Sequence, residues 1–536
     1  MKRTTYFLGG LVAVAAIVLA LAAVLPGPAQ GTPTPEKSVH FESEEVHSSG
    51  SVRSGLIATP YEAVAGTLIV HPRGWDDAAG APDKKAENNP DAEAAMFYVA
   101  YFKKGANSRE RPVTFLFNGG PGSSTVWLHM GAFGPKRVVT ADDSHTPAAP
   151  YKLVDNASSL LDTTDLVFID APAAGFSRIA GKDKEKAFFG VDQDAYAFTQ
   201  FIKKFLSKYG RWNSPKYLFG ESYGTTRSAV VVNALSNEES IDFNGVIMLS
   251  QILAFDLSPD GPETNPGVDL PYQLVLPTYA ATAWYHNRLP GKRPDNMVAF
   301  VREVEHFAMT DYASALSAGN SLDPKRRQAI AEKLHRYTGL SVGYILKADL
   351  RISGGVFEKA LQDQAELTTG RLDTRFSGPT IDPLSKTADY DPQSSAISSA
   401  YVSAFNDYVR ESLKYGEGKT FKPFAEVYAT WDFKHKPPGA GMALQASTNV
   451  MPDLALAMKT NPHLKVLLTG GYYDLATPYY EGWYEMHHLP IPASLTGNIE
   501  YEYYPSGHMV YAHEDSLKAL HDNVAAFIRK TDNIAP

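Results

Sequence analysis

The sequence of 536 residues contains no cysteine, which excludes disulfide bonds, thiolate metal sites and a cysteine-linked lipid anchor. It also has no surplus of positive charge, because 50 Lys and Arg stand against 59 Asp and Glu and give a formal net charge of -9. This balance argues against nucleic acid as a partner. The 15 histidines do not fall at metal-ligand spacings such as H-x-x-x-H with a third donor, so we predict no metal site and no other cofactor.

What the sequence has in quantity is apolar and aromatic residues. Apolar residues make up 44% of the chain and charged residues 20%, with 29 Tyr and 26 Phe. This composition is typical of ordered globular proteins. The chain is longer than one small core needs, so we expect a large domain with a sizeable insertion. The sequence does not specify an oligomeric state.

One long apolar run lies at the N-terminus. Lys2 and Arg3 precede an apolar stretch from Tyr6 to Leu25, and a Pro- and Gly-containing stretch closes the segment 1–31. This pattern predicts an export signal and a periplasmic or extracellular location. The run is long enough to span a bilayer, so both a cleaved signal peptide and an uncleaved membrane anchor through residues 6–25 fit it. Residues 32–50 are rich in Pro, Glu, Ser and Thr, and we expect them to form a flexible tether.

Strand-like and helix-like segments alternate in two separate parts of the chain. Short apolar runs predict strands at 112–117, 165–169, 217–219, 245–249, 465–469 and 499–504, and helical spacing predicts helices at 192–209, 225–235 and 514–529. Such alternation predicts a mainly parallel sheet flanked by helices. Between them the strand signal fades and helices are expected at 279–287, 297–316 and 394–415. We therefore predict a core in two parts, 51–253 and 442–536, split by a mostly helical cap insertion, 254–441.

A G-x-S-x-G motif lies between a predicted strand and a predicted helix. It reads Gly220-Glu221-Ser222-Tyr223-Gly224, directly after the strand at 217–219. This context is the one a nucleophile elbow requires, with a serine on a turn so tight that only glycines fit around it. The side chain then projects beside the positive end of a helix. We predict that Ser222 is a catalytic nucleophile.

A second glycine-rich turn follows an earlier strand. Asn118-Gly119-Gly120-Pro121-Gly122 comes directly after the predicted strand that ends at residue 117. Hydrolases with a nucleophile elbow form part of the oxyanion hole at such a turn, where backbone N–H groups converge on the carbonyl oxygen of the substrate. We predict that the N–H groups of Gly120 and Tyr223 form this hole.

A catalytic serine needs a base, and the base needs a carboxylate that orients it, in the chain order serine, acid, histidine. Asp474 and His508 each follow a predicted strand of the second core part and satisfy this order. His129 and His513 are the nearest alternatives to His508. Asp170 also ends a strand but precedes the serine, so we expect it to orient the loop after it. The predicted triad is Ser222, Asp474 and His508.

Together these motifs resemble the serine carboxypeptidases, a family that includes yeast and plant vacuolar carboxypeptidases and cathepsin A. The resemblance rests on the following segments: Asn118 to Ser124, Gly134-Pro135, Gly175-Phe176-Ser177, Gly220 to Gly224, Gly471 to Asp474, and Gly507-His508-Met509. The runs Gly220 to Arg227 and His508 to Tyr511 look most like the bacterial branch. The resemblance implies the α/β-hydrolase fold and peptide substrates with a free C-terminal carboxylate.

In that family an asparagine, the N–H of the next glycine and a protonated glutamate before the nucleophile hold the terminal carboxylate of the substrate. The matching residues here are Asn118, Gly119 and Glu221. A carboxyl group beside an anionic substrate should have a raised pKa. The eukaryotic members carry a second glutamate where this chain has Ala132, and a cysteine where it has Ser123.

Three functions are compatible with these residues. The first is a serine carboxypeptidase that works through an acyl-enzyme. The second is an esterase or acyltransferase with the same triad, since the alanine at 132 loosens the carboxylate site. The third is a non-catalytic, anchored binding protein on a hydrolase scaffold.

Overall fold

The computed structural model describes residues 40–77, 89–443 and 447–534. The expected export signal, 1–31, and residues 32–39 of the expected tether lie outside these ranges. Over the described ranges, no helix combines the length and the apolar character needed to cross a membrane.

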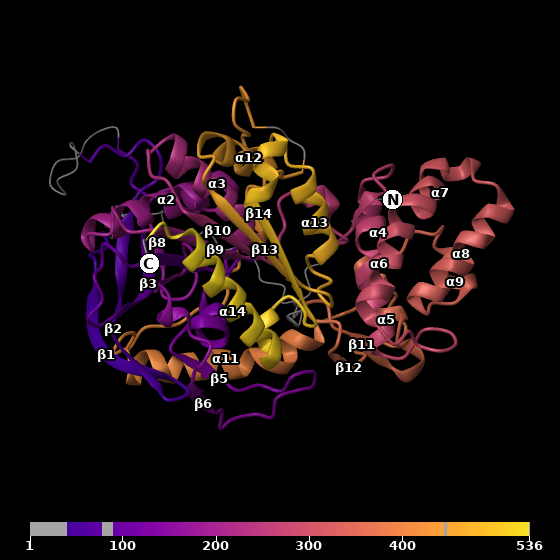
Figure 1. Cartoon of the computed structure of the whole chain (residues 1–536), viewed down its shortest axis with the longest axis horizontal. Coiled ribbons are helices and arrows are strands. Elements are labelled where there is room, and N and C mark those ends of the chain that lie inside the picture. The colour runs from indigo at the N-terminus through magenta and orange to yellow at the C-terminus, as the bar shows by residue number, and fades with distance from the viewer. Residues whose placement is uncertain (1–39, 78–88, 444–446, 535–536) are drawn as a thin grey trace, which may run out of the picture.

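A large twisted sheet forms the centre of the molecule (Figure 1). Its strands are β1 (Glu45–Ser54), β2 (Ile57–Val70), β3 (Glu93–Lys103), β4 (Val113–Phe117), β7 (Asp165–Ile169), β8 (Arg178–Ala180), β9 (Lys216–Glu221), β10 (Gly245–Leu249), β13 (Lys465–Gly471) and β14 (Ile499–Tyr504). The strand order is β1-β2-β3-β7-β4-β9-β10-β13-β14, and β8 pairs with β3. From β7 to β14 all neighbours are parallel, whereas β1, β2 and β3 form antiparallel pairs.

Helices cover both faces of this sheet. They are α1 (Lys184–Phe188), α2 (Val191–Lys208), α3 (Tyr223–Asn237), α11 (Pro392–Glu411), α12 (Met451–Thr460), α13 (Tyr479–His487) and α14 (Glu514–Thr531). The apolar residues of α2, α3 and α12 share one buried cluster with Phe115 and Phe117 of β4, and those of α11 and α14 share another with Leu116. Successive side chains of a strand point to opposite faces, so β4 contributes to both clusters. This layered arrangement is the α/β-hydrolase fold, and it confirms the predicted fold class.

A separate helical lobe lies beside the sheet, on the right in Figure 1. It contains α4 (Leu270–Leu274), α5 (Leu276–Tyr285), α6 (Met297–Phe307), α7 (Ala313–Ala318), α8 (Pro324–Thr338), α9 (Val342–Lys347) and α10 (Gly354–Ala360). These helices share an apolar cluster of their own. The lobe is smaller than the expected cap, 254–441, because α11 packs on the sheet. Helical spacing predicts a helix but does not tell which surface its apolar side meets.

Short elements connect these parts. Two small antiparallel sheets pair β5 (Lys136–Val138) with β6 (Leu153–Asp155), and β11 (Leu367–Thr369) with β12 (Ser377–Pro379). Single helical turns occur at Leu128–Phe133, Leu160–Asp162, Phe255–Leu257, Pro262–Thr264, Ala308–Tyr312, Gly319–Ser321, Asp363–Ala365, Tyr428–Thr430, Ala493–Asn498 and Val510–Ala512.

The expected tether, 32–50, differs from the structure over Glu45–Gly50. These residues form the first part of β1, paired in register with Tyr61 to Gly66 of β2. Most of their side chains are exposed or half-buried. An edge strand with polar side chains has no apolar alternation, so its composition resembles that of a linker.

A buried histidine fixes the chain that returns from α11 to the core. Nδ1 of His435 lies 2.7 Å from Oδ1 of Asp192, and its Nε2 lies 2.7 Å from Oδ2 of Asp453. Burial lowers the pKa of His435, but hydrogen bonds and charge from the two carboxylates outweigh this and raise it to about 9. The charged histidine therefore joins α2 to α12 at neutral pH.

Candidate active site

The predicted functional turns all leave the sheet at the same edge. The strand register pairs Phe117 with Gly220, Leu249 with both Glu221 and Thr469, and Gly471 with Tyr504. These residues end parallel strands, so the loops that follow them begin side by side. This carboxyl edge is where open α/β sheets bind their ligands.

Ser222 occupies the turn between β9 and α3. Its backbone has φ 61° and ψ -130°, and its N–H donates to the carbonyl oxygen of Leu249 at 3.0 Å. A Cβ at Gly220 would lie 2.2 Å from the carbonyl oxygen of Gly224, and one at Gly224 would lie 2.8 Å from that of Phe117. A positive φ is unfavourable for serine, so the surrounding contacts hold the turn in a strained form. The side chain of Ser222 is half-buried.

The structure brings Asp474 and His508 into direct contact. Nδ1 of His508 lies 2.8 Å from Oδ2 of Asp474, and both residues are buried. The other carboxylate oxygen, Oδ1, accepts hydrogen bonds from the N–H groups of Ala476 and Thr477 at 2.9 and 3.0 Å. A histidine that donates from Nδ1 keeps Nε2 as an acceptor, which is the tautomer that a general base requires.

Competing effects set the basicity of His508. Burial lowers its pKa, but the charge and hydrogen bond of Asp474 and the charge of Glu221 outweigh this and raise it above the ordinary value of 6.5. The neighbouring carboxylate thus makes the imidazole a stronger proton acceptor, which suits a general base.

Glu221 directly precedes Ser222 in the chain, and its side chain lies in a cluster of polar groups. It is 2% exposed, and the hydroxyl of Tyr511 donates to its Oε2 at 2.8 Å. Burial raises the pKa of Glu221 to about 7, although the charge of His508 and hydrogen bonds from Tyr511 and Asn118 oppose this. The side chain is therefore protonated in mildly acidic solution and can then donate a hydrogen bond.

The Asn118–Gly122 turn packs against the serine turn. A Cβ at Gly119 would lie 2.4 Å from the backbone nitrogen of Tyr223, so only glycine allows this approach. Gly120 has φ +106°, a conformation that favours glycine. Oδ1 of Asn118 accepts a hydrogen bond from the N–H of Leu128 at 3.1 Å, which fixes the orientation of its amide.

The alternatives to the predicted triad lie elsewhere. His129 is buried against Phe168, bonds to Tyr101 at 2.7 Å, and has a pKa lowered to about 3 by burial. His513 bonds to Ser516 at the start of α14. Asp170 accepts the N–H of Thr125 at 2.7 Å and so holds the end of the glycine-rich turn.

Several supporting residues carry no local sequence signal. Tyr511 reaches Glu221 across 290 positions of the chain. Arg227 donates to the carbonyl oxygen of Asn118 at 2.8 Å and forms a fully buried ion pair with Asp194. The hydroxyl of Thr477 lies 2.8 Å from Oδ2 of Asp474. The sequence offers one indication of their role: Arg227 closely follows the serine turn, and Tyr511 closely follows His508.

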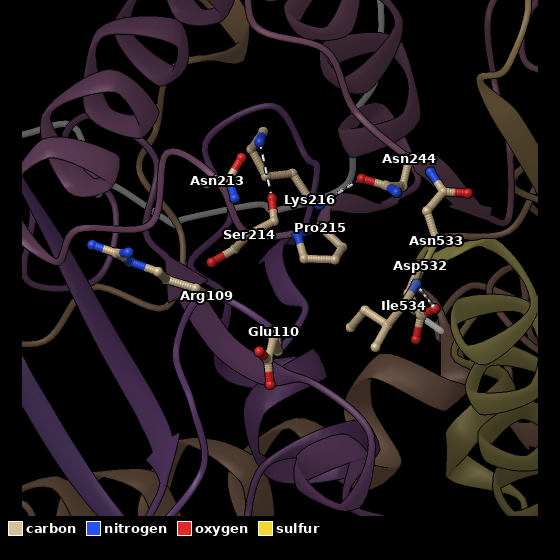
Figure 2. A pocket seen from close by; sticks show the side chains of 10 residues that line it. All are labelled: Arg109, Glu110, Asn213, Ser214, Pro215, Lys216, Asn244, Asp532, Asn533 and Ile534. Atoms are coloured by element: carbon tan, nitrogen blue, oxygen red, sulfur yellow. Dashed lines mark hydrogen bonds between the residues drawn. The ribbon is translucent and has the colours of Figure 1, made fainter. Parts of the chain in front are cut away.

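A cavity of about 690 Å³ lies at the opposite, amino-terminal edge of the sheet (Figure 2). Its lining includes Lys216 at the start of β9 and Asn244 just before β10. It is therefore remote from the carboxyl edge. Across residues 40–77, 89–443 and 447–534, no group of three or more His, Asp or Glu side chains is arranged to hold a metal ion.

Comparison with known proteins matches this site to one family. The model of the family described as serine carboxypeptidase matches residues 86–255, which include both the glycine-rich turn and the serine turn. This part of the chain is similar to the serine carboxypeptidase family. The match includes β3 and ends six residues after β10.

Curated relatives with this description align with a limited part of the chain. Serine carboxypeptidase-like 5 from Arabidopsis thaliana is 30% identical over 150 residues, which cover 28% of this chain and 32% of the relative. The pheromone-processing carboxypeptidase KEX1 from Cryptococcus gattii is 28% identical over 184 residues, covering 34% and 25%. The chain thus spans about a third or less of the length of these serine carboxypeptidases.

A solved structure supports the fold over a longer range. The prohormone-processing carboxypeptidase KEX1 from Saccharomyces cerevisiae aligns with a TM-score of 0.51 and 16% identity, covering 88% of this chain and 91% of that one. At this identity the likeness shows that the fold is shared.

Proposed function

We propose that this protein is an exported serine carboxypeptidase that releases C-terminal residues from peptides. The observation that carries the proposal is the buried carboxyl of Glu221, which lies directly before Ser222 and has a pKa raised to about 7 by burial. An elbow serine alone is compatible with many hydrolases. A protonated carboxyl beside it gives the site a donor for a carboxylate-ended substrate.

In the proposed reaction Ser222 attacks the carbonyl carbon of the last peptide bond. Nε2 of His508 takes the hydroxyl proton and passes it to the leaving amine, while Asp474 holds the imidazole through Nδ1. Water, deprotonated by the same histidine, then hydrolyses the acyl-enzyme. The hydrogen bond of 2.8 Å between Nδ1 and Oδ2 of Asp474 supports the role of the acid.

The backbone N–H groups of Gly120 and Tyr223 are proposed to stabilise the negative charge that develops on the carbonyl oxygen. The absence of a side chain at Gly119 supports this role, because it lets the glycine-rich turn approach the nitrogen of Tyr223. Donors fixed in the backbone need no rearrangement when the charge forms.

The carboxylate site is proposed to consist of the amide of Asn118, the N–H of Gly119 and the carboxyl of Glu221. The amide is held by Leu128, and Glu221 is held by Tyr511. The substrate would be a peptide with a free C-terminal carboxylate, since neutral donors in a buried site favour an anion.

One observation favours a second candidate, an esterase or acyltransferase with the same triad. Ala132 is fully buried, and it stands where a second glutamate would assist carboxylate binding in related proteins. An enzyme of this kind would turn over esters and release no amino acid from peptides.

The test compares an N-blocked dipeptide with its C-terminal amide and with an N-blocked amino acid ester. We expect kcat/KM to be at least about tenfold higher for the free acid than for the amide, since one charged hydrogen bond contributes roughly 1.5–3 kcal/mol. Diisopropyl fluorophosphate should label Ser222 and not the Ser222→Ala variant. Turnover of the ester without cleavage of either dipeptide would favour the second candidate. Equal cleavage of acid and amide would contradict recognition of the free carboxylate, and absence of both labelling and turnover would refute hydrolysis.

We also propose export to the periplasm or the extracellular space, supported by the apolar run Tyr6 to Leu25 behind Lys2 and Arg3. Cell fractionation tests this location, and sequencing of the mature N-terminus distinguishes a cleaved signal from a retained membrane anchor. Recovery of the full-length chain in the cytoplasm would contradict the proposal.

A further inference from the structure

The loop between β11 and β12, Gly370–Phe376, lies where the helical lobe meets the sheet (Figure 1). We call it the hairpin tip. It belongs to the segment between the two core parts, yet it forms hydrogen bonds with both loops that carry the acid and the base of the triad.

The first contact is with the histidine loop. The N–H of His508 donates to the carbonyl oxygen of Leu372 at 2.6 Å, and the N–H of Gly507 donates to Oδ2 of Asp373 at 3.2 Å. A Cβ at Gly507 would lie 2.4 Å from the Cβ of Asp373. The hairpin tip therefore packs directly on the backbone of the base.

The second contact is with the loop of the acid. The N–H of Leu475 donates to the carbonyl oxygen of Arg371 at 3.0 Å, and the N–H of Thr374 donates to the carbonyl oxygen of Tyr473 at 2.9 Å. These two partners are the residues on either side of Asp474. Leu475 is also part of the apolar cluster of the lobe.

The backbones of the two triad loops bond to each other only before they reach Asp474 and His508. Backbone hydrogen bonds join Tyr472 to Tyr504 and Tyr473 to Ser506, both at 3.0 Å. Beyond this point the bonds to the hairpin tip hold the neighbours of the acid and the backbone of the base. The tip thus acts where the sheet register no longer fixes the loops.

The hairpin tip is itself firmly held. Asp373 is fully buried and pairs with Arg375, whose Nη2 lies 2.7 Å from its Oδ2. Oδ1 of Asp391 accepts the N–H of Arg371 at 2.7 Å, and its Oδ2 accepts the N–H of Ser394 in the first turn of α11 at 3.0 Å. The tip is therefore tied both to an ion pair and to a helix that packs on the sheet.

We propose that the hairpin tip sets the relative position of Asp474 and His508, and that Asp373 is a positioning residue that acts through Gly507. The inference rests on the proposed function, because it assigns these two residues to catalysis. A triad functions only when its groups are held to within about 0.5 Å, so an element that bonds to both loops controls the chemical step.

The test uses two variants of the full chain, Asp373→Ala and Asp373→Asn. Both break the ion pair with Arg375, and only Asn keeps an oxygen that accepts the N–H of Gly507. We expect Asp373→Ala to lower kcat on the blocked dipeptide about 100-fold with KM within about twofold, as a misplacement of about 1 Å does. The kcat of Asp373→Asn should be at least about tenfold higher than that of Asp373→Ala, although the melting temperatures of the two variants fall equally.

The matched control is Asp269→Asn. Asp269 pairs with Arg351 inside the helical lobe, at 2.7 Å. Its variant should lose stability and keep the kcat of the unchanged protein at temperatures where it remains folded.

Two outcomes overturn the inference and leave the proposed function intact. One is an unchanged kcat in Asp373→Ala, and the other is an equal loss of kcat in both Asp373 variants in step with their melting temperatures. If Asp373→Ala does not fold, a kcat in Asp373→Asn as low as about 1% of normal overturns it. An unchanged protein that diisopropyl fluorophosphate does not label refutes the proposed function, and the inference with it.

Discussion

Replacing Glu221 by glutamine tests the carboxylate site most directly. The change keeps the size of the side chain and an oxygen that accepts the hydroxyl of Tyr511, but it removes the group that titrates. In the unchanged protein burial raises the pKa of Glu221 to about 7. Under the proposed function, the carboxyl would donate a hydrogen bond to the substrate carboxylate below this pH, and the ionised group would repel that carboxylate above it.

The size of the effect follows from the fraction of Glu221 that is protonated. With a pKa of about 7 this fraction falls from about 0.9 at pH 6 to about 0.1 at pH 8, so KM for a free-acid dipeptide should rise about tenfold. In Glu221→Gln the amide donates at every pH, and KM should stay constant over the same range. The amidated dipeptide carries no carboxylate and should show no such rise with either protein.

Stability gives an independent measurement of the same group. The folded pKa lies above the ordinary value of 4.5, so its favourable contribution is complete below pH 4.5 and is lost as the pH rises through about 7. A shift of this size corresponds to about 3 kcal/mol. Urea unfolding should therefore show Glu221→Gln gaining up to about 3 kcal/mol on the unchanged protein between pH 5 and pH 8. Ser222→Ala, which removes no titrating group, should show no such gain.

An equal rise of KM in both proteins would refute this role of Glu221, because some other group would then control carboxylate binding. The same rise with the amidated dipeptide would also refute it. A stability difference that does not change with pH would mean that Glu221 is ionised throughout the range.

Three further changes test other parts of the site and fold. Gly119→Ala places a Cβ 2.4 Å from the nitrogen of Tyr223 and should lower kcat by about 100- to 1000-fold, measured on the blocked dipeptide; a normal kcat would remove the turn from the oxyanion hole. Asp474→Asn should lower kcat by about 10,000-fold with little change in KM, and a loss under tenfold would contradict its role as the acid. His435→Gln should cost roughly 3 kcal/mol at pH 7 in urea unfolding. Because its two carboxylates raise the pKa of His435 to about 9, this difference should shrink as the pH rises through 9; a constant difference would show that the histidine is neutral.

The secondary structure of the core was accessible from sequence because its signals are local. The predicted strands at 165–169 and 245–249 coincide with β7 and β10, and the predicted helix at 192–209 differs from α2 by one residue at each end. Short apolar runs bounded by turn residues specify buried parallel strands. The first strand escaped prediction because polar residues on an exposed edge carry no such alternation.

The candidate site also contains residues that the sequence indicates and residues that it does not. The serine turn, Asp474 and His508 each lie in a short motif after a strand, so each could be proposed as a site residue from the sequence alone. The contact between Asp373 and Gly507 joins positions 134 residues apart. Both residues follow the helical lobe in the chain, whereas Ser222 precedes it. Nothing in the local pattern indicates such a pair, since either residue alone reads as part of a surface turn.

The pH dependence of the proposed carboxylate binding depends on how many groups around Glu221 titrate. Two tyrosines fill the space beside Gly131, the neighbour of Ala132. A Cβ at Gly131 would lie 2.6 Å from the hydroxyl of Tyr401 and 2.7 Å from the ring of Tyr511. Burial raises the pKa of Tyr511 well above 10, so its hydroxyl keeps its proton over the working range. With Ala132 in place of a second carboxyl, Glu221 is the carboxyl of the proposed carboxylate site that titrates. The logarithm of KM for a free-acid substrate should therefore rise with a limiting slope of about one per pH unit, whereas two interacting carboxyls would give a steeper or a two-step dependence.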